Sequence, residues 1–277
     1  MSDRVVPARL RILPASDAPV AVVLRRKPAK QFHVLLWHTT SGKIEQGSWF
    51  RGNIRADWSD LSPDGQWFAY AALGAKGDEA WTGVCRPPKL TTVVHWDNPG
   101  FFPEGAFWAD EKTLINLTNH HHVPALHPVD QITKRPLPFS IVTSKEAPSP
   151  RSKFHRDGWI ASEKIPAEAR DETDRKWYAR VFEVPEVMEL RREGSPTLFR
   201  WNREVRGKHR FGFALEGFGD FVGKDCDDVC WDSKGCLLVA RAGVLERYSL
   251  ADLEARTPSS QLDLNPLEKP VKTNRKR

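Results

Sequence analysis

The sequence predicts an all-β protein built from many short strands joined by tight turns. Its 277 residues include 21 Pro, 18 Gly and 11 Trp but only 3 Tyr, and turn formers mixed with aromatic residues favour short strands over long helices. The chain is 40% hydrophobic and 28% charged, which is an ordinary globular composition. A turn that recurs at nearly constant spacing is the third observation, and it sets the expected architecture.

The clearest copy of this unit is the hairpin over residues 58–72. Pro63 presets φ for the second position of a tight turn, and Gly65 can take a positive φ without steric cost. The apolar run at residues 66–70 (QWFAY) that follows suits a half-buried strand. The turn at residues 62–65 (SPDG) with its apolar strand resembles the inner hairpin of a β-propeller blade of the TolB-like or WD-repeat kind.

Comparable turns recur along the chain, and each precedes a short apolar strand. They are marked by Asp17, Asp64, Asp110, Asp157 and Asp232. The first four lie 47, 46 and 47 residues apart, which matches the length of a four-stranded propeller blade. The last gap of 75 residues can hold one degenerate blade or one long insertion. The sequence therefore predicts a β-propeller of five or six four-stranded blades.

The expected organisation is one propeller domain over residues 1–255 and a basic, disordered tail over residues 256–277. The strand near residues 8–13 is expected to join the last blade and close the ring, because closure removes exposed sheet edges. Ser249 is placed to cap a short helical turn. The proline-rich segment 132–151 is interpreted as a loop or insertion.

The positive charge is concentrated at the C-terminus. The last nine residues hold five Lys or Arg and no acid, so the net charge of +6 falls to about +1 over residues 1–268. A nearly neutral body argues against nucleic acid as the main partner. No stretch reaches the roughly 18 apolar residues that a membrane span needs, and no secretory signal is recognisable. We expect a cytoplasmic protein without membrane contact that is monomeric on its own.

No residue pattern identifies a catalytic site or a metal site. There is no Gly-x-Ser-x-Gly elbow, and the recurring aspartates, with Asp57 and Asp60 among them, are interpreted as turn-stabilising side chains that accept from nearby backbone amides. The four cysteines are expected to be free thiols, and their spacing does not fit a zinc finger. We therefore expect no catalytic residue, no metal and no cofactor.

Two stretches are predicted to contact a partner. The first mixes aromatic residues with arginines, which are enriched at protein interfaces, although its tryptophan could instead pack between blades. The second is a run of three histidines on an expected blade-edge loop, where a metal is the less favoured alternative because neighbouring residues on a strand face opposite ways. The predicted contact residues are Trp49, Arg51, Arg55, His120, His121 and His122.

Fold alone does not give function, so three hypotheses stay open. The leading one is a non-enzymatic interaction scaffold that binds a protein through one loop-lined rim. The first alternative is an enzyme, or a binding protein for a small ligand or sugar, with its site in the central funnel. Changes to acids in the funnel would then abolish activity that rim changes spare. The second alternative is weak nucleic-acid binding through the basic tail, which would fall steeply with salt.

Overall fold

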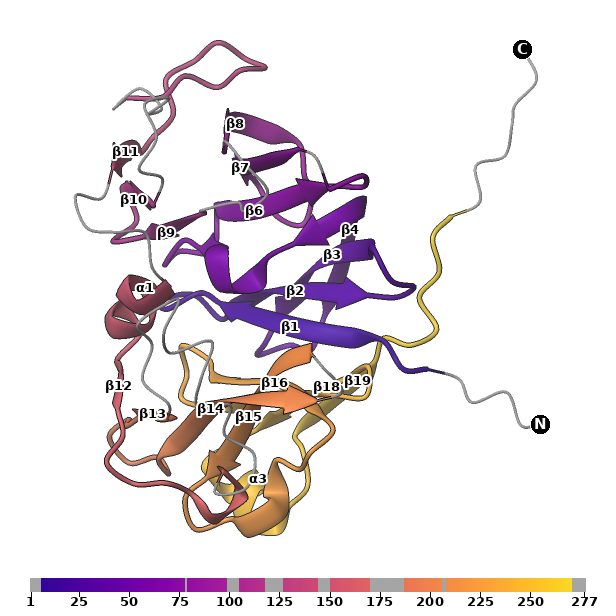
Figure 1. Ribbon diagram of the computed structural model, residues 1–277, viewed down its shortest axis with the longest axis vertical. Helices are drawn as coiled ribbons and strands as arrows, with labels where there is room; N and C mark the ends of the chain where they lie inside the picture. The colour runs from indigo at the N-terminus through magenta and orange to yellow at the C-terminus, as the bar shows by residue number, and fades with distance from the viewer. Residues whose placement is uncertain are drawn as a thin grey trace.

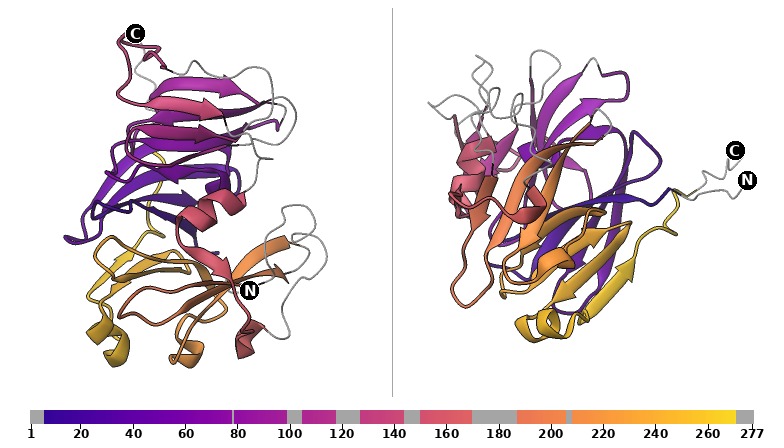
Figure 2. Two further views of the ribbon diagram at one scale, coloured as in Figure 1. Left: turned by 90° about the vertical axis from the view of Figure 1, so that its left-hand side faces the viewer. Right: turned by 60° about the horizontal axis from the view of Figure 1, so that its bottom comes forward.

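In the computed structural model, the chain is an all-β protein whose mostly antiparallel sheets form two halves. The structure describes residues 6–77, 79–98, 105–117, 127–143, 150–169, 187–205 and 208–270. Residues up to 143 form the upper half in Figure 1, and residues 150–270 form the lower half. Helix α1 (Pro150–Arg156) and strand β1 (Arg9–Pro14) lie at the boundary, and the left view of Figure 2 shows α1 there too.

The first part of the upper half is one sheet of eight strands. Its strands are β1, β2 (Val20–Arg26), β3 (Gln31–His38), β4 (Ile44–Ile54), β5 (Asp60–Leu61), β6 (Phe68–Gly74), β7 (Ala80–Cys85) and β8 (Thr92–Asp97). The end of β4 pairs with β6, and this joins two four-stranded meanders edge to edge. The 3₁₀ turn η1 (Ala56–Trp58) connects β4 to β5. Gly52 allows the join, since a Cβ there would lie 2.3 Å from the Leu73 carbonyl oxygen.

Three smaller sheets complete the fold. The upper half adds β9 (Ala106–Trp108), β10 (Thr113–Asn116) and β11 (Ser140–Thr143). The lower half holds β12 (Trp159–Ala161), β13 (Val187–Leu190), β14 (Leu198–Val205) and β15 (Lys208–Leu215), then β16 (Cys226–Trp231), β17 (Leu237–Arg241), β18 (Val244–Tyr248) and β19 (Ser260–Asp263). Its short helical elements are η2 (Ala167–Ala169), η3 (Gly219–Phe221) and α3 (Leu250–Ala255).

Four of the five predicted turns connect consecutive strands, and the turn at Asp157 instead lies between α1 and β12. In the turn at residues 62–65, the Ser62 hydroxyl donates to Asp64 (2.5 Å) and accepts from the Trp67 amide (2.9 Å). Gly65 has a φ of +75°, as that turn requires. Side-chain bonds within the turn therefore fix the hairpin that the sequence made most conspicuous.

Two other expectations about local structure have opposite outcomes. The Ser249 cap is confirmed, because its side chain accepts from the Asp252 amide while the Asp252 carboxylate accepts from the Ser249 amide. The segment 132–151 is not only a loop, since β11 lies within it and pairs in parallel with β10. The four prolines of this segment do not interrupt the strand because they lie outside residues 140–143.

The expectation that the N-terminal strand joins the last sheet is wrong. β1 pairs antiparallel with β2, from Arg9 opposite Arg26 to Pro14 opposite Ala21. The first and last sheets meet through side chains instead, in a cluster that contains Leu10, Ile12, Trp37, Leu238, Ala240 and Leu245. Leu10, Leu238, Ala240 and Leu245 in this cluster are fully buried. Apolar packing between side chains therefore holds the first sheet against the last one, where pairing of β1 with the last sheet was expected.

The segment expected to be a tail from residue 256 begins inside the fold. Residues 260–263 form β19, which pairs with β18, and Leu264 is buried. Arg25, itself buried, donates from Nε to the Leu264 carbonyl (2.6 Å) and from Nη2 to the Asn265 carbonyl (3.1 Å). The Asn265 side chain in turn accepts from the Ala8 amide at 2.8 Å. Hydrogen bonds of the segment that follows β19 therefore connect the first sheet to the last sheet.

Replacing Arg25 by methionine should lower the free energy of unfolding by about 2–3 kcal/mol, because two buried carbonyls lose a charged donor while the volume stays filled. Urea denaturation followed by tryptophan fluorescence measures this. Arg51→Met is the matched control, since Arg51 is exposed on β4, and it should change stability by no more than about 0.5 kcal/mol. Equal effects of both variants would contradict the fastening role of Arg25.

Candidate functional site

The turns predicted from the sequence converge around one cavity of about 810 Å³. Its lining includes Asp17, Pro63, Asp110, Asp157 and Asp232, one residue from each of the five turns. The first two turns are bonded to each other, because the amides of Asp17 and Ala18 donate to the Pro63 carbonyl at 3.0 and 3.2 Å. We call the surface formed by these turns around the cavity the turn face.

Both halves of the molecule supply walls of this cavity. The upper half contributes β1, η1 and β5, and the lower half contributes α1, β12, β14 and β16. Charged side chains of both signs line it, and those among the described residues are seven Lys or Arg and eight Asp or Glu. These charges nearly cancel, so the chemistry of this lining depends on how they are paired.

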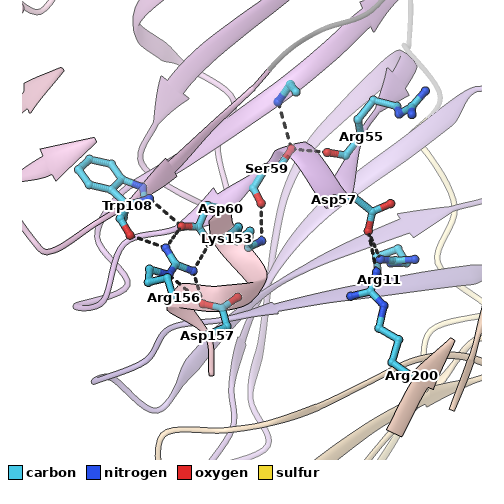
Figure 3. A network of polar contacts seen from close by, with 11 residues as sticks. Arg11, Arg55, Asp57, Ser59, Asp60, Trp108, Lys153, Arg156, Asp157 and Arg200 are labelled. Atoms are coloured by element: carbon cyan, nitrogen blue, oxygen red, sulfur yellow. Dashed lines mark hydrogen bonds and ion pairs between the residues drawn. The ribbon is translucent and has the colours of Figure 1, made fainter. Parts of the chain in front are cut away.

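The first charged cluster surrounds Asp60 and joins β5 to α1 (Figure 3). The Asp60 carboxylate, 3% exposed, forms ion pairs with Lys153 (3.3 Å) and Arg156. It also accepts from the Trp108 amide (2.8 Å), and the Arg156 guanidinium donates to the Trp108 carbonyl. Lys153 donates onward to the Ser59 carbonyl at 2.6 Å. One buried carboxylate thus connects three segments that lie far apart in the sequence.

The cations decide the ionisation of Asp60. Burial by itself opposes the charged form, but the charges of Lys153 and Arg156 outweigh it and hold the pKa of Asp60 below its ordinary value. The same pairing raises the pKa of Arg156 despite the burial of its guanidinium. Arg156 also forms an ion pair with Asp157, so two carboxylates face the two cations of this cluster.

The second charged cluster surrounds Asp57 in the same wall. Asp57 pairs with Arg11 of β1 (2.6 Å) and with Arg200 of β14 (3.4 Å), and Arg11 also reaches Asp228 of β16 (3.1 Å). The Arg200 guanidinium lies over the rings of Phe154 and Phe211, at 4.4 and 3.5 Å from their centroids. Arg11 and Arg200 outweigh burial and lower the pKa of Asp57.

This pairing limits the chemistry that the cavity can perform. A carboxylate held ionised between two cations is a weak general base and a poor proton donor at neutral pH. Burial and the nearby charge of Asp228 raise the pKa of Cys230, which lines the cavity, so its reactive thiolate is disfavoured. Among the described residues there is no group of three metal-ligating side chains, and no helix is long and apolar enough to span a membrane.

A smaller cavity of about 310 Å³ lies on the other side of the Asp57 cluster. Arg11, Ala56 and Asp57 line both cavities. Along β1, residues 12–14 face only the larger cavity, whereas Arg9 and Leu10 face only the smaller one. The Arg11–Asp57 ion pair thus separates two compartments along the boundary between the halves.

The structure describes three of the six predicted contact residues. Trp49 is half-buried and stacks on His33 of the neighbouring strand β3, with ring centroids 4.1 Å apart, so this contact lies within one sheet. Arg51 is exposed on β4, whereas Arg55 lines the smaller cavity. The run from His120 to His122 lies outside the described residues.

The role expected for the recurring aspartates holds for some of them. Asp64, Asp110 and Asp232 accept from amides of their own turns. Asp57 and Asp60 instead pair with distant cations, so their interpretation as local turn stabilisers is wrong. Nothing in the sequence spacing could have matched them with residues 46 to 143 positions away.

Comparison with solved structures finds weak likenesses. An uncharacterised protein from Listeria monocytogenes matches with 9% identity and a TM-score of 0.34, over 88% of this chain and 62% of that one. The β-propeller domain of the Trilobed protease from Pyrococcus furiosus has 12% identity and a TM-score of 0.33, over 88% and 82%. The WD40 domain of SCAP from fission yeast has 10% identity and a TM-score of 0.22, over 91% and 65%. This chain thus spans less than two thirds of the Listeria protein. No protein-family model and no curated protein matches the chain.

Proposed function

We propose that the protein is a non-enzymatic, propeller-like binding module that holds a protein partner against its turn face. The observation that carries this proposal is the convergence of the five recurring turns around the 810 Å³ cavity. Loops held by a rigid β framework are where binding residues concentrate in such proteins. The paired state of Asp57 and Asp60 supports a structural role for the cavity acids rather than a catalytic one.

The proposed blade number is five. Among its described residues, the 75-residue interval that precedes Asp232 contains one sheet, β12–β15. This favours one blade with an inserted segment over two blades. The sheet containing β1–β8 corresponds to two blades joined through β4 and β6.

Protein is favoured over nucleic acid as the partner because the exposed charges of the turn face have both signs. Asp17 and Glu111 are exposed there beside the exposed cations Lys112 and Arg191. A surface that binds phosphates by counterion release needs a clear excess of cations. A mixed rim suits a partner with complementary charges of its own.

The second candidate function is binding of a small ligand inside the larger cavity. It is favoured by two buried polar atoms of residues in the lining, Trp231 Nε1 and Ser233 Oγ, which have no hydrogen-bond partner among the described residues. Buried donors of this kind are normally satisfied, so a ligand or water would complete them. The volume lies within the range of small-molecule sites.

Affinity capture of the tagged protein from its host lysate, with mass spectrometry, tests the leading proposal. The rim variant Asp17→Lys/Glu111→Lys/Lys112→Glu changes exposed charges on the turn face, and Glu254→Lys/Glu268→Lys/Lys89→Glu makes the same changes at exposed residues outside the cavity lining. A stoichiometric protein retained by the second variant and lost by the first is the expected result. A partner kept by both variants, or the absence of any stoichiometric partner, would contradict the proposal.

A further inference from the structure

The smaller cavity carries a surplus of arginine side chains. Its lining includes Arg9, Arg11, Arg26 and Arg55, against the two acids Asp57 and Asp227. The four arginines come from β1, the end of β2 and the residue after β4, so the fold gathers them from separate strands. We call these four residues and the cavity they line the arginine pocket.

Both acids of the arginine pocket have partners other than Arg9, Arg26 and Arg55. Asp57 is already engaged by Arg11 and by Arg200, which lies outside the pocket lining. Asp227 accepts from the Leu10 amide at 3.3 Å. Among the described residues, Arg9, Arg26 and Arg55 form no ion pair with an acid. Figure 3 shows the Arg55 side chain extending away from Asp57.

Two of these cations are forced together by the strand register. Arg9 lies directly opposite Arg26 in the pairing of β1 with β2, so both side chains project from the same face of the sheet. Burial, and then the charge of Arg9, lower the pKa of Arg26. Like charges held opposite each other are unfavourable until an anion lies between them.

Five large apolar side chains also line the pocket, together with Asn53, Ala56 and Cys226. Leu10, Leu24, Phe32, Ile54 and Phe211 line it. The guanidinium of Arg26 lies 5.7 Å from the centroid of the Phe32 ring, and that of Arg11 lies 5.0 Å from the centroid of Phe211. Both phenylalanines are largely buried, at 5% and 9% exposed, and each lies beside a cation in the pocket wall. The 310 Å³ volume is at the lower end of the range for small-molecule sites.

We propose that the arginine pocket binds a small phosphate monoester that carries an apolar or aromatic group. A phosphate dianion matches the surplus charge, and guanidinium groups bind phosphate oxygens in a two-pronged geometry that a lysine cannot form. The organic group would lie against Phe32 or Phe211. This inference is independent of the partner proposed for the turn face, because the pocket lies on the other side of the Arg11–Asp57 pair.

Isothermal titration calorimetry with phenyl phosphate, inorganic phosphate and benzyl alcohol tests the pocket. We expect saturable binding of phenyl phosphate at least tenfold tighter than that of inorganic phosphate, none of benzyl alcohol, and weaker binding as salt is raised. Arg26→Met and Arg55→Met should each weaken phenyl phosphate at least tenfold. Arg51→Met, on the same strand as Asn53 of the pocket but outside its lining, should leave affinity unchanged.

The melting temperature in phosphate-free buffer distinguishes a structural role of these arginines from a role in binding. Because Arg26 faces Arg9 and no described acid, Arg26→Met should melt no lower than the parent protein, and adding phenyl phosphate should raise Tm only in the parent. The proposal is overturned if no probe binds below millimolar concentration. It is also overturned if Arg26→Met and Arg55→Met bind as the parent does, or if only a long phosphorylated peptide or an RNA binds.

Discussion

Replacing Asp60 by asparagine should lower the free energy of unfolding by about 3–5 kcal/mol. The substitution keeps the shape of the side chain but leaves Lys153, which is 10% exposed, beside a neutral group, while Arg156 keeps its ion pair with Asp157. Breaking a buried ion pair from one side costs more than the pair contributes, because the remaining charge is desolvated without compensation. Urea denaturation at pH 7, monitored by tryptophan fluorescence, measures the loss.

A double-mutant cycle shows whether the loss comes from the uncompensated charge. Asp60→Asn/Lys153→Met restores the charge balance, so it should lose less than the sum of the two single variants by about 1–3 kcal/mol. Asp110→Asn is the control, because Asp110 is an exposed turn aspartate whose nearest bond is to the Lys112 amide. Additive losses would show that Asp60 and Lys153 do not act as a pair.

The Asp60 cluster matters because it lies where the two halves meet. Lys153 and Arg156 belong to α1, which follows the upper half in sequence, whereas Asp60 and Trp108 belong to β5 and β9. The Asp57 cluster makes the same kind of connection. β1 does not pair with a strand of the last sheet. The two halves are therefore held together by these charged contacts and by the apolar cluster that contains residues of β1 and β17. A cavity between the halves depends on both.

The elements that the sequence predicted well are those fixed by neighbouring residues. The turn at residues 62–65 and the cap at Ser249 are closed by bonds that span at most five positions, so the residues themselves specify them. The apolar run at residues 237–240, which follows the turn at Asp232, became β17, since burial on both faces needs an unbroken apolar run.

The features that the sequence did not reveal depend on contacts across the fold. Arg25 donates to backbone carbonyls 239 and 240 positions away. Every residue has a backbone carbonyl, so no sequence pattern identifies these acceptors. The arginine pocket needs the register that sets Arg9 against Arg26, which spacing alone does not give. The recurring turns do mark the position of the candidate site, because they surround the larger cavity.

The stability of the protein should fall by about 3 kcal/mol between pH 7 and pH 4 through one histidine, His33. Its ring is 1% exposed, and burial, followed by the nearby charge of Arg25, lowers its pKa from 6.5 to about 4. Between pH 6.5 and pH 4, the unfolded chain therefore binds a proton at His33 that the folded chain does not bind. The contribution is complete above pH 6.5 and is lost progressively as the pH falls from 6.5 to 4.

This window separates His33 from the carboxylates. The lowered pKa values of Asp57 and Asp60 mean that their contribution persists above about pH 4 and is lost only below it. Urea denaturation at pH 7, 5.5 and 4.2 should therefore show a decline that His33→Phe removes, since phenylalanine keeps a ring to stack on Trp49 but cannot bind a proton. His95→Phe, at an exposed position on β8, should keep the whole decline. If the free energy of unfolding of His33→Phe falls with pH as steeply as that of the parent, protonation of His33 is not the cause of the acid destabilisation.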